Sequence, residues 1–411
     1  MAALLAAGYH VTCCGRDQAR LQARFPACRV VEYDVTSPLP SEALDAVLQG
    51  VSVVINTVGI IQERGKNTFD VVHRQGPIEL FRAASRVGVR RIIHISALGA
   101  DSQADTDYHL TKRDADDVLR TLPVEWVILQ PSLVYGRGGR SYTFFSALTA
   151  LPVLLMPGHG DQRIQPVHVE DLVAGIVRLV ESSAVSRVTL AVVGPEPITF
   201  RQFMEAVRGW LGLERGIVVP VPMGLVRLAA WVGDAVRSDF VNSETFAMLC
   251  RGNVAEAGPF TTATGVKPRP IATGLPVAAG RSAYTTACLD LLRPLLLAGL
   301  SAVWIGSGLV SLFVFPRETS EAWLLRVGIP EGWTGAALVG ASLVDIVLGI
   351  GTILRRHLSL LLVMQLALIV GYSAVLTIRM PELWAHPFGP LLKNIPLFVV
   401  TLFLWLLERR P

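Results

Sequence analysis

The sequence predicts a chain in two parts, an α/β domain with a doubly wound parallel sheet followed by an all-α bundle of four transmembrane helices. Three observations predict this. Apolar residues make up 51% of the 411 residues, and the mean hydropathy of +0.47 is high for a wholly soluble protein. Short β-branched runs alternate with amphipathic stretches over residues 1–270, as in βαβ units. Residues 289–411 carry long apolar runs with charges only in short clusters.

The expected strands of the first part are apolar almost throughout, as strands covered by helices on both faces should be. They are residues 10–14, 29–35, 51–59, 90–96 and 126–132. Amphipathic stretches at 69–88 and after Tyr108 are the expected helices between them. We therefore expect residues 1–135 to form the core of the α/β domain.

A smaller lobe is expected over residues 136–270, where the alternation loosens. Its expected elements are helices at 167–182 and 198–212 and a strand at 187–194. Residues 271–288, rich in proline, glycine and alanine, are expected to be a linker. We expect the lobe to cover a substrate bound at the sheet.

Four apolar segments of residues 289–411 are each about as long as the 20 residues needed to cross a bilayer. They lie near residues 294–315, 332–354, 358–378 and 390–407. A soluble helix bundle would need polar faces that these segments lack. If both ends of the bundle lie inside, the clusters Arg293, Arg355–Arg356 and Arg409–Arg410 flank the spans on one side, as the positive-inside rule requires. We therefore expect a multi-pass protein of the inner membrane with its soluble domain facing the cytoplasm.

The charge and cysteine patterns argue against several classes of site. The net charge of +4 comes almost wholly from arginine, since the chain has four lysines and no basic run, so nucleic-acid binding is not expected. The five cysteines show no CxxC motif and no metal-ligand spacing with histidines. Neither a metal site nor a disulfide framework is therefore expected, and a reducing compartment suits them.

The strongest local motif is Tyr108-His-Leu-Thr-Lys112, at the start of an expected helix and twelve residues after Ser96 at a strand end. One helical turn places Lys112 beside Tyr108. A nearby ammonium lowers the pKa of a tyrosine, which then exchanges a proton with a substrate hydroxyl or carbonyl near neutral pH. Ser96 is placed to hydrogen-bond the same oxygen. The alternative is a surface tyrosine with a solvated lysine, which we disfavour because the chain has so few lysines.

Residues at three successive strand ends are candidates for binding a dinucleotide, because open α/β sheets bind ligands beyond the carboxyl ends of their strands. Arg16 follows the first strand, where an arginine suits the 2′-phosphate of NADP and an acid suits the ribose of NAD. Asp17 is one place later and competes with it, so NAD stays possible. Asp34-Val35 ends the second strand, and Thr57-Val58-Gly59 ends the third, where glycine permits a close approach of the backbone.

Taken together, the segments YHLTK, NTVG, DVT, HISALGAD and LQPSLVYG resemble an atypical or extended short-chain dehydrogenase/reductase of the NAD-dependent epimerase/dehydratase superfamily. The nearest groups are the NmrA-like proteins and the dehydrogenase-like accessory subunit of respiratory complex I. The resemblance covers about residues 1–270 and implies a Rossmann-like fold. It also implies that Tyr108 and Lys112 are the catalytic pair and Ser96 the third member. Pro131, Ser132 and Val134 would lie on the nicotinamide side. HPFGPLLKNIP, residues 386–396, is similar to a DoxX-like membrane domain.

One part of the family pattern is missing. The family begins with a strand and a Gly-rich turn that binds the pyrophosphate, whereas AALLAAGYHV corresponds to the later part of the helix after that turn. The sheet is therefore expected to have a gap between the strands at His10 and Val51. Our hypothesis is that Met1 is not the natural start or that the chain is a truncated remnant.

Asp345, inside the second apolar segment, is costly in lipid and is therefore a candidate functional residue. It would bind a quinone-like headgroup or relay a proton. The equally weighted alternative is a buried hydrogen bond to Ser342 or to a neighbouring helix.

Three functional hypotheses remain. The leading one is a membrane-anchored, NAD(P)-dependent oxidoreductase or epimerase-like enzyme that acts on a small, lipophilic carbonyl or alcohol substrate. The second is a non-catalytic protein whose NADP(H) is structural or sensory and whose helices dock a membrane redox complex. The third is a degenerate domain that binds no nucleotide.

Overall fold

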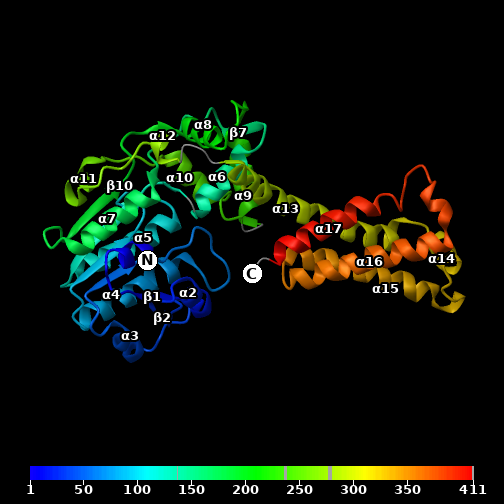
Figure 1. The fold of residues 1–411 in the computed structure, drawn as a ribbon, viewed down its shortest axis with the longest axis horizontal. Coiled ribbons are helices and arrows are strands. Elements are labelled where there is room, and N and C mark those ends of the chain that lie inside the picture. The colour runs from blue at the N-terminus through cyan, green and yellow to red at the C-terminus, as the bar shows by residue number, and fades with distance from the viewer. Residues whose placement is uncertain (137, 236–237, 276–279, 410–411) are drawn as a thin grey trace. The chain divides into compact units, whose positions relative to one another are not determined.

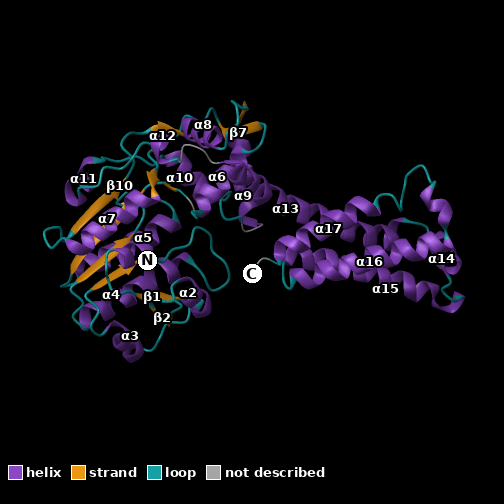
Figure 2. Cartoon of the chain, in the orientation of Figure 1, coloured by secondary structure: helices purple, strands orange, loops and turns teal. Residues whose placement is uncertain are grey.

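The computed structural model describes residues 1–136, 138–235, 238–275 and 280–409, in two compact units, Met1–Ala287 and Cys288–Pro411 (Figures 1 and 2). The strands of the first unit are β1 (Thr12–Gly15), β2 (Arg29–Glu32), β3 (Val53–Asn56), β4 (Arg91–Ile95), β5 (Glu125–Pro131), β6 (Val134–Tyr135), β7 (Val153–Pro157), β8 (Arg163–Ile164), β9 (Val167–His168), β10 (Val188–Val192), β11 (Ile198–Thr199) and β12 (Ile217–Val221). Its helices are α1 (Ala2–Ala6), α2 (Gln18–Arg24), α3 (Ser41–Leu48), the π-helix η1 (Asp70–Gln75), α4 (Gly76–Arg86), α5 (Asp107–Thr121), α6 (Arg140–Thr149), α7 (Val169–Glu181), α8 (Phe200–Trp210), α9 (Met223–Ala235), α10 (Ser243–Arg251), α11 (Gly258–Thr264) and α12 (Ile271–Gly274).

The main sheet is parallel, in the order β10-β5-β4-β3. β1 and β2 form a separate parallel pair, and among the described strands none lies between β1 and β3. The gap that the sequence predicts in the sheet is thus present. The structure confirms the Rossmann-like parallel sheet as the fold of this unit.

Helices cover both faces of the sheet, because side chains along each strand point alternately to opposite faces. On β4, Ile92 packs with Phe81 of α4 in one core, whereas Ile93 packs with Leu179 of α7 in the other. β5 alternates in the same way. This double cover explains why the strands are apolar almost throughout.

The expected helix at 69–88 is in fact η1 followed by α4. Pro77 provides a reason, because in a regular helix its ring would clash with the carbonyl of His73 four residues earlier. The wider π turn relieves that clash. His73, which lies in η1, is buried.

The smaller lobe has its own aromatic core, formed by α6, α8, β7 and their neighbours, with Tyr142, Phe200 and Phe203 at its centre. β7 and β12 form a parallel pair in this lobe. Arg208 of α8 ties the lobe's loops together by donating to the carbonyls of Thr149, Leu151 and Glu214.

The second unit is helical throughout its regular structure. Its elements are α13 (Gly280–Leu309, which begins in the first unit), η2 (Val310–Val314), α14 (Arg317–Val327), η3 (Glu331–Trp333), α15 (Thr334–Leu354), α16 (Leu358–Arg379), η4 (Pro381–Trp384) and α17 (Asn394–Glu408). Among the described residues, three helical segments are long and apolar enough to cross a membrane: Ser282–Val314, Glu331–Leu354 and Leu358–Arg379.

The fourth expected span differs from the prediction. α17 has 15 residues and begins at Asn394 rather than near Pro390. Pro387, Gly389 and Pro390 precede it, and residues of these types interrupt a helix. Such a helix is about 22 Å long, short of the roughly 30 Å of a bilayer's hydrocarbon core.

Two glycines allow α13 and α15 to pack closely against each other. A Cβ atom at Gly308 would lie 2.5 Å from the carbonyl oxygen of Ser342, and one at Gly349 would lie 2.5 Å from Ile305. Each helix thus contributes one glycine against the backbone or side chain of the other, as close packing of membrane helices requires.

Buried polar groups of this unit include the side chains of Thr352, Gln365 and Ser342. Gln365 donates to Thr352 inside the bundle at 2.8 Å, and both side chains are fully buried. Ser342 donates to the carbonyl of Leu338 and not to Asp345, whose Oδ1 is buried without a hydrogen-bond partner among the described residues. The alternative in which Asp345 hydrogen-bonds to Ser342 is therefore not supported among the described residues.

One of the arginines expected to flank the spans forms an ion pair at the end of another helix. Arg293 of α13 forms an ion pair with Glu408 at the end of α17, so these two helix ends lie together. Arg410 falls outside the described residues.

Candidate active site

Tyr108 and Lys112 lie in the first half of α5, which begins where the Thr106 hydroxyl accepts from the backbone N–H of His109. As the four-residue spacing predicts, the two side chains meet: the Lys112 Nζ lies 5.6 Å from the centre of the Tyr108 ring. Phe69 and His73 contact the same ring edge-on, at 5.9 and 5.1 Å between ring centres. Tyr108 is thus held by aromatic contacts on more than one side.

Lys112 is buried, with 4% of its surface exposed, and its ammonium donates to the carbonyl of Ile95 at 3.3 Å. Burial lowers its pKa to about 8, although Asp116 acts in the opposite direction. An ammonium has three N–H donors, and among the described residues this one donates to the Ile95 carbonyl alone. Gly59 adjoins it, since a Cβ there would lie 3.6 Å from the Lys112 Nζ. The remaining donors suit the hydroxyls of a ribose.

The expected effect of Lys112 on Tyr108 is not found in the structure. Removal of the hydroxyl from water raises the pKa of Tyr108 to about 12, and the Lys112 ammonium lies over the ring, 5.6 Å from its centre. Tyr108 is therefore protonated at neutral pH and is a proton donor rather than an acceptor.

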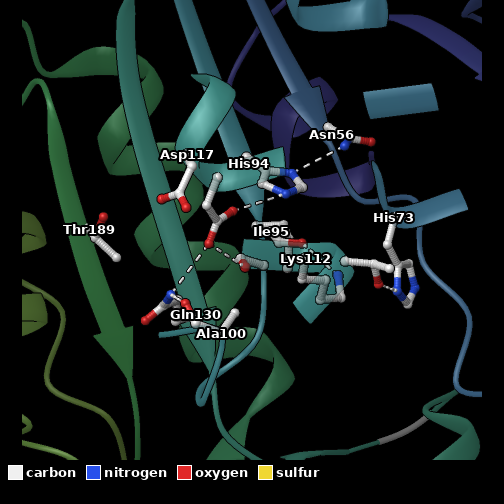
Figure 3. A network of polar contacts seen from close by, with 12 residues as sticks. Asn56, His73, His94, Ile95, Ala100, Lys112, Asp117, Gln130 and Thr189 are labelled. Carbon is white, nitrogen blue, oxygen red and sulfur yellow. Dashed lines mark hydrogen bonds and ion pairs between the residues drawn. The ribbon is translucent and has the colours of Figure 1, made fainter. Parts of the chain in front are cut away.

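Ser96 belongs to a buried network that sequence reasoning missed, and Figure 3 shows His94, Asn56 and Gln130 of this network. Its hydroxyl donates to Asp116 Oδ2 at 2.7 Å, and Gln130 donates to the same oxygen at 3.4 Å. The other oxygen, Asp116 Oδ1, lies 3.4 Å from the Nε2 of His94. Burial raises the pKa of Asp116 to about 6, against the hydrogen bond from Ser96 and the charges of Arg120 and Lys112.

The network fixes which nitrogen of His94 carries the proton. The backbone N–H of Val58 donates to Asn56 Oδ1 at 3.2 Å, so the amide nitrogen of Asn56 is the atom that faces His94 Nδ1, at 3.1 Å. Nδ1 must then accept, which leaves the proton on Nε2, facing the Asp116 carboxyl. Burial lowers the pKa of His94 well below its usual value and keeps the ring neutral.

His73 forms a second support. Its Nε2 accepts from the backbone N–H of Ile60 at 3.0 Å, and its ring stacks on Phe69 at 5.3 Å. Burial, followed by the charge of Lys112, lowers its pKa to about 2, so it stays neutral. His73 therefore holds the loop after Gly59 against the Tyr108 ring.

The N-terminus of α5 is bound by the smaller lobe. The two carboxylate oxygens of Glu244 accept from the backbone N–H groups of Asp107 and Tyr108, at 3.3 and 3.2 Å. Arg251, on the same helix α10, donates to the carbonyl of Gly99 at 3.0 Å and to Asp101 at 2.7 Å. The lobe thus contacts both the N-terminus of α5 and the loop that precedes it.

The candidate cofactor residues near β1 and β2 lie on the separate strand pair. Arg16 is exposed directly after β1 and donates to Asn67 at 3.0 Å. Asp17 caps α2 by accepting from the backbone N–H of Arg20 at 2.9 Å, so it is engaged elsewhere. Asp34 accepts from both the N–H and the hydroxyl of Thr36.

The other candidates lie at the ends of the main sheet or pack inside. Thr57 and Gly59 are exposed after β3, with Val58 half-buried between them. Val35 packs against Gly76, where a Cβ would lie 2.8 Å from it. Pro131 ends β5.

Two candidates expected on the nicotinamide side join the main sheet to the lobe. Ser132 is buried and donates to the carbonyl of Gln165. Val134 belongs to β6, which pairs with β9.

Two parts of the chain match models of known protein families. Residues 1–150 match a family model described as NAD(P)H-binding, and residues 301–402 match one described as a DoxX-like family. The chain joins an NAD(P)H-binding domain to a DoxX-like domain. The matched stretches include the Tyr108–Lys112 pair in the first domain and Asp345 in the second.

Curated relatives are similar to about half of the chain. A ceramide reductase of Caulobacter vibrioides is 28% identical over 204 residues, which is 49% of this chain and 63% of the relative. The mitochondrial NADH-ubiquinone oxidoreductase 40 kDa subunit of Neurospora crassa is 22% identical over 209 residues, 49% of this chain and 54% of the relative. A mouse mitochondrial protein, NADH dehydrogenase 1 alpha subcomplex subunit 9, is 25% identical over 215 residues, 52% of this chain and 55% of the relative. The chain thus spans little more than half the length of these relatives.

Solved structures show the same fold. A nucleoside-diphosphate-sugar epimerase from Staphylococcus aureus has a TM-score of 0.54 with 16% identity, over 67% of this chain and 93% of that one. A UDP-glucuronic acid 4-epimerase from Bacillus cereus, solved with NAD, has a TM-score of 0.52 with 16% identity, over 71% and 94%.

Proposed function

We propose that this membrane protein is an NADP(H)-dependent reductase in which Tyr108 protonates the carbonyl oxygen of a lipophilic substrate. The observation that carries the proposal is the pairing of Tyr108 with a buried Lys112 whose donors are only partly used. The bound cofactor would supply the hydride for the carbonyl carbon. A relative named a ceramide reductase supports a lipid as the substrate class.

Each residue has a stated task in this proposal. Lys112 donates to the ribose hydroxyls and holds the nucleotide beside Gly59. Tyr108, protonated at neutral pH, gives its proton to the oxygen as that oxygen gains charge. Ser96 turns its hydroxyl from Asp116 toward the same oxygen, and Asp116 Oδ2 keeps the amide of Gln130 as its donor.

The cofactor preference is proposed to be NADP over NAD. Arg16 is exposed at the end of β1, and the competing acid Asp17 is engaged as the cap of α2. An arginine there suits a 2′-phosphate. The domain is proposed to face the cytoplasm from the inner membrane, a proposal that rests on the sequence pattern of Arg293, Arg355 and Arg356 beside the apolar segments.

Turnover of long-chain ketones by the detergent-purified full chain tests the proposal, with NADPH oxidation as the readout. Tyr108→Phe should lower turnover by about 100-fold or more, while calorimetric NADPH affinity changes by less than about twofold. Tyr9→Phe, a tyrosine outside the site, is the matched control and should behave as the wild type. Full turnover by Tyr108→Phe would overturn the proposal.

The direction of the reaction is part of the same test. Because the pKa of Tyr108 is raised, the proton-accepting phenolate is scarce at neutral pH. Oxidation of the corresponding alcohols should therefore be slow at pH 7 and rise with pH, whereas ketone reduction should not. A flat pH profile for alcohol oxidation would exclude Tyr108 as the base.

A second candidate is a non-catalytic subunit whose NADP(H) is structural and which docks a membrane redox complex. The engagement of Ser96 by Asp116 favours it, as do relatives named as NADH dehydrogenase subunits. A co-purifying membrane complex that persists in Tyr108→Phe, with no ketone turnover in the wild type, would support this candidate over the first.

A further inference from the structure

The smaller lobe exposes an apolar surface formed by α9 and the β7–β12 pair. We propose that this surface lies in the headgroup region of the bilayer, so that the lobe is docked on the membrane and not only tethered to it. The surface consists of the exposed side chains Leu155, Ile217, Val219, Leu225, Leu228, Trp231 and Val232.

The large apolar side chains of α9 face outward, whereas those of a surface helix in a soluble protein face inward. Its inward side is made by small residues, Ala230 and Gly233, and a Cβ at Gly233 would overlap the carbonyl of Val241. Its outward side carries Leu225, Leu228 and Trp231, the last with 66% of its surface exposed. A helix in water puts its large apolar residues inward. Leucine and tryptophan on the outer face are typical of a helix that lies in a membrane interface.

The strand pair extends the surface. β7 and β12 are parallel and in register, with Leu155 opposite Val219. Leu155 and Ile217 are 62% and 68% exposed. Residues two apart on a strand share a face, so Ile217, Val219 and Leu155 lie on one side of the pair. A contiguous apolar surface of this kind on a soluble domain marks an interaction site.

The chain connection to the membrane helix favours the bilayer as the occupant. Within the first unit, Ala283 and Ala287 of α13 pack against Trp210, Leu211 and Leu213. β12 begins a few residues after Leu213, so the packing site of α13 adjoins one end of the strand pair. The surface and the helix that enters the membrane therefore belong to one lobe.

The helix rise brings that packing site close to lipid. α13 is continuous from Gly280 to Leu309, and Arg293 stands at the start of its long apolar run. Ala287 precedes Arg293 by six residues, which is about 9 Å along a helix. An interfacial helix inserts about 5–10 Å into the boundary of headgroups and acyl chains. A connection this short allows an apolar surface of the lobe to reach that boundary.

Depth-dependent quenching of Trp231 tests the proposal in the full chain. The protein is reconstituted in bilayers of phosphatidylcholine and phosphatidylglycerol, with or without lipids brominated near the headgroup end of the acyl chain. The fluorescence emission of Trp231 is obtained by subtracting the emission of Trp231→Phe from that of the wild type. The emission of the core residue Trp126, obtained in the same way from Trp126→Phe, is the control. We expect brominated lipid to quench the Trp231 emission at least twofold and to leave the Trp126 emission unchanged.

A variant with charges on the apolar surface distinguishes insertion of that surface in the bilayer from mere closeness of Trp231 to the bilayer. Leu225→Glu combined with Leu228→Glu should abolish the quenching of Trp231, and because both leucines are exposed the fold should be kept. Ala23→Glu, on an exposed position of α2, should leave the quenching unchanged. Trp231 emission that brominated lipid does not quench would overturn the proposal. If that emission were also blue-shifted, a second copy of the chain or the helix bundle would be the occupant.

Discussion

The buried carboxyl of Asp116 should make the stability of the NAD(P)H-binding domain depend on pH in a direction unusual for an acid. Its pKa is raised to about 6 by burial, whereas an aspartate in an unfolded chain titrates near about 3.9. Between these values the folded state keeps a proton that the unfolded state has lost. Stability from this group is therefore full below about pH 4 and is lost as the pH rises to about 6.

The magnitude follows from the shift. Two pKa units at about 1.4 kcal/mol each give about 3 kcal/mol less free energy of unfolding at pH 7 than at pH 4 from this group. Asp116→Asn removes the titration and keeps an oxygen for the Ser96 hydroxyl. Relative to the wild type, the variant should gain roughly 6–12 °C in melting temperature as the pH is raised from about 4 to 7.

The assay is thermal unfolding of the detergent-solubilised full chain, followed by circular dichroism at one scan rate because unfolding of such proteins is often irreversible. Asp117→Asn is the matched control, since this neighbour is 59% exposed and pairs with Arg120 at the surface. It should track the wild type. Parallel pH curves for Asp116→Asn and the wild type would refute the reasoning.

Three further changes have defined outcomes. Gly59→Ala should fold normally, because its Cβ would only reach ordinary van der Waals contact with Lys112 and His73. If the nucleotide approaches the backbone at this position, the affinity for NADPH measured by calorimetry should fall about tenfold. Arg16→Leu should lower NADPH affinity about tenfold and leave NADH affinity unchanged; equal losses would contradict a contact with the 2′-phosphate. Arg91→Leu should lower the free energy of unfolding, measured by chemical denaturation, by about 3–5 kcal/mol. The reason is that the fully buried guanidinium pairs with Glu125 and donates to the carbonyls of Leu179 and Ser182. A loss under about 1 kcal/mol would contradict this reasoning.

The strands were predictable because sheet burial leaves a local record in the sequence, and the Tyr108–Lys112 contact was predictable because helix geometry fixes it. The network around Asp116 was missed because Asn56, His94 and Asp116 come from β3, β4 and α5, and no local pattern joins them. One signal was present: Asp116 follows Lys112 by the same four residues that separate Lys112 from Tyr108.

Two other differences arise from side chains whose effect depends on their neighbours. The effect of Pro77 on η1 was visible in the sequence, but a proline near a helix start is also compatible with a regular helix. The apolar face of α9 was not separable from a buried one, because amphipathic spacing does not say which side is solvent.

The glycine contacts between α13 and α15 say where the membrane bundle tolerates change. Most lipid-facing positions can exchange one apolar side chain for another, since lipid accommodates any shape. At Gly308 and Gly349 the addition of a single methyl group would force two backbones apart. The distance between α13 and α15 is thus set by the absence of a side chain at these two glycines. In a random mutational scan of the bundle, substitutions at these glycines should therefore be tolerated less well than substitutions at the larger apolar residues.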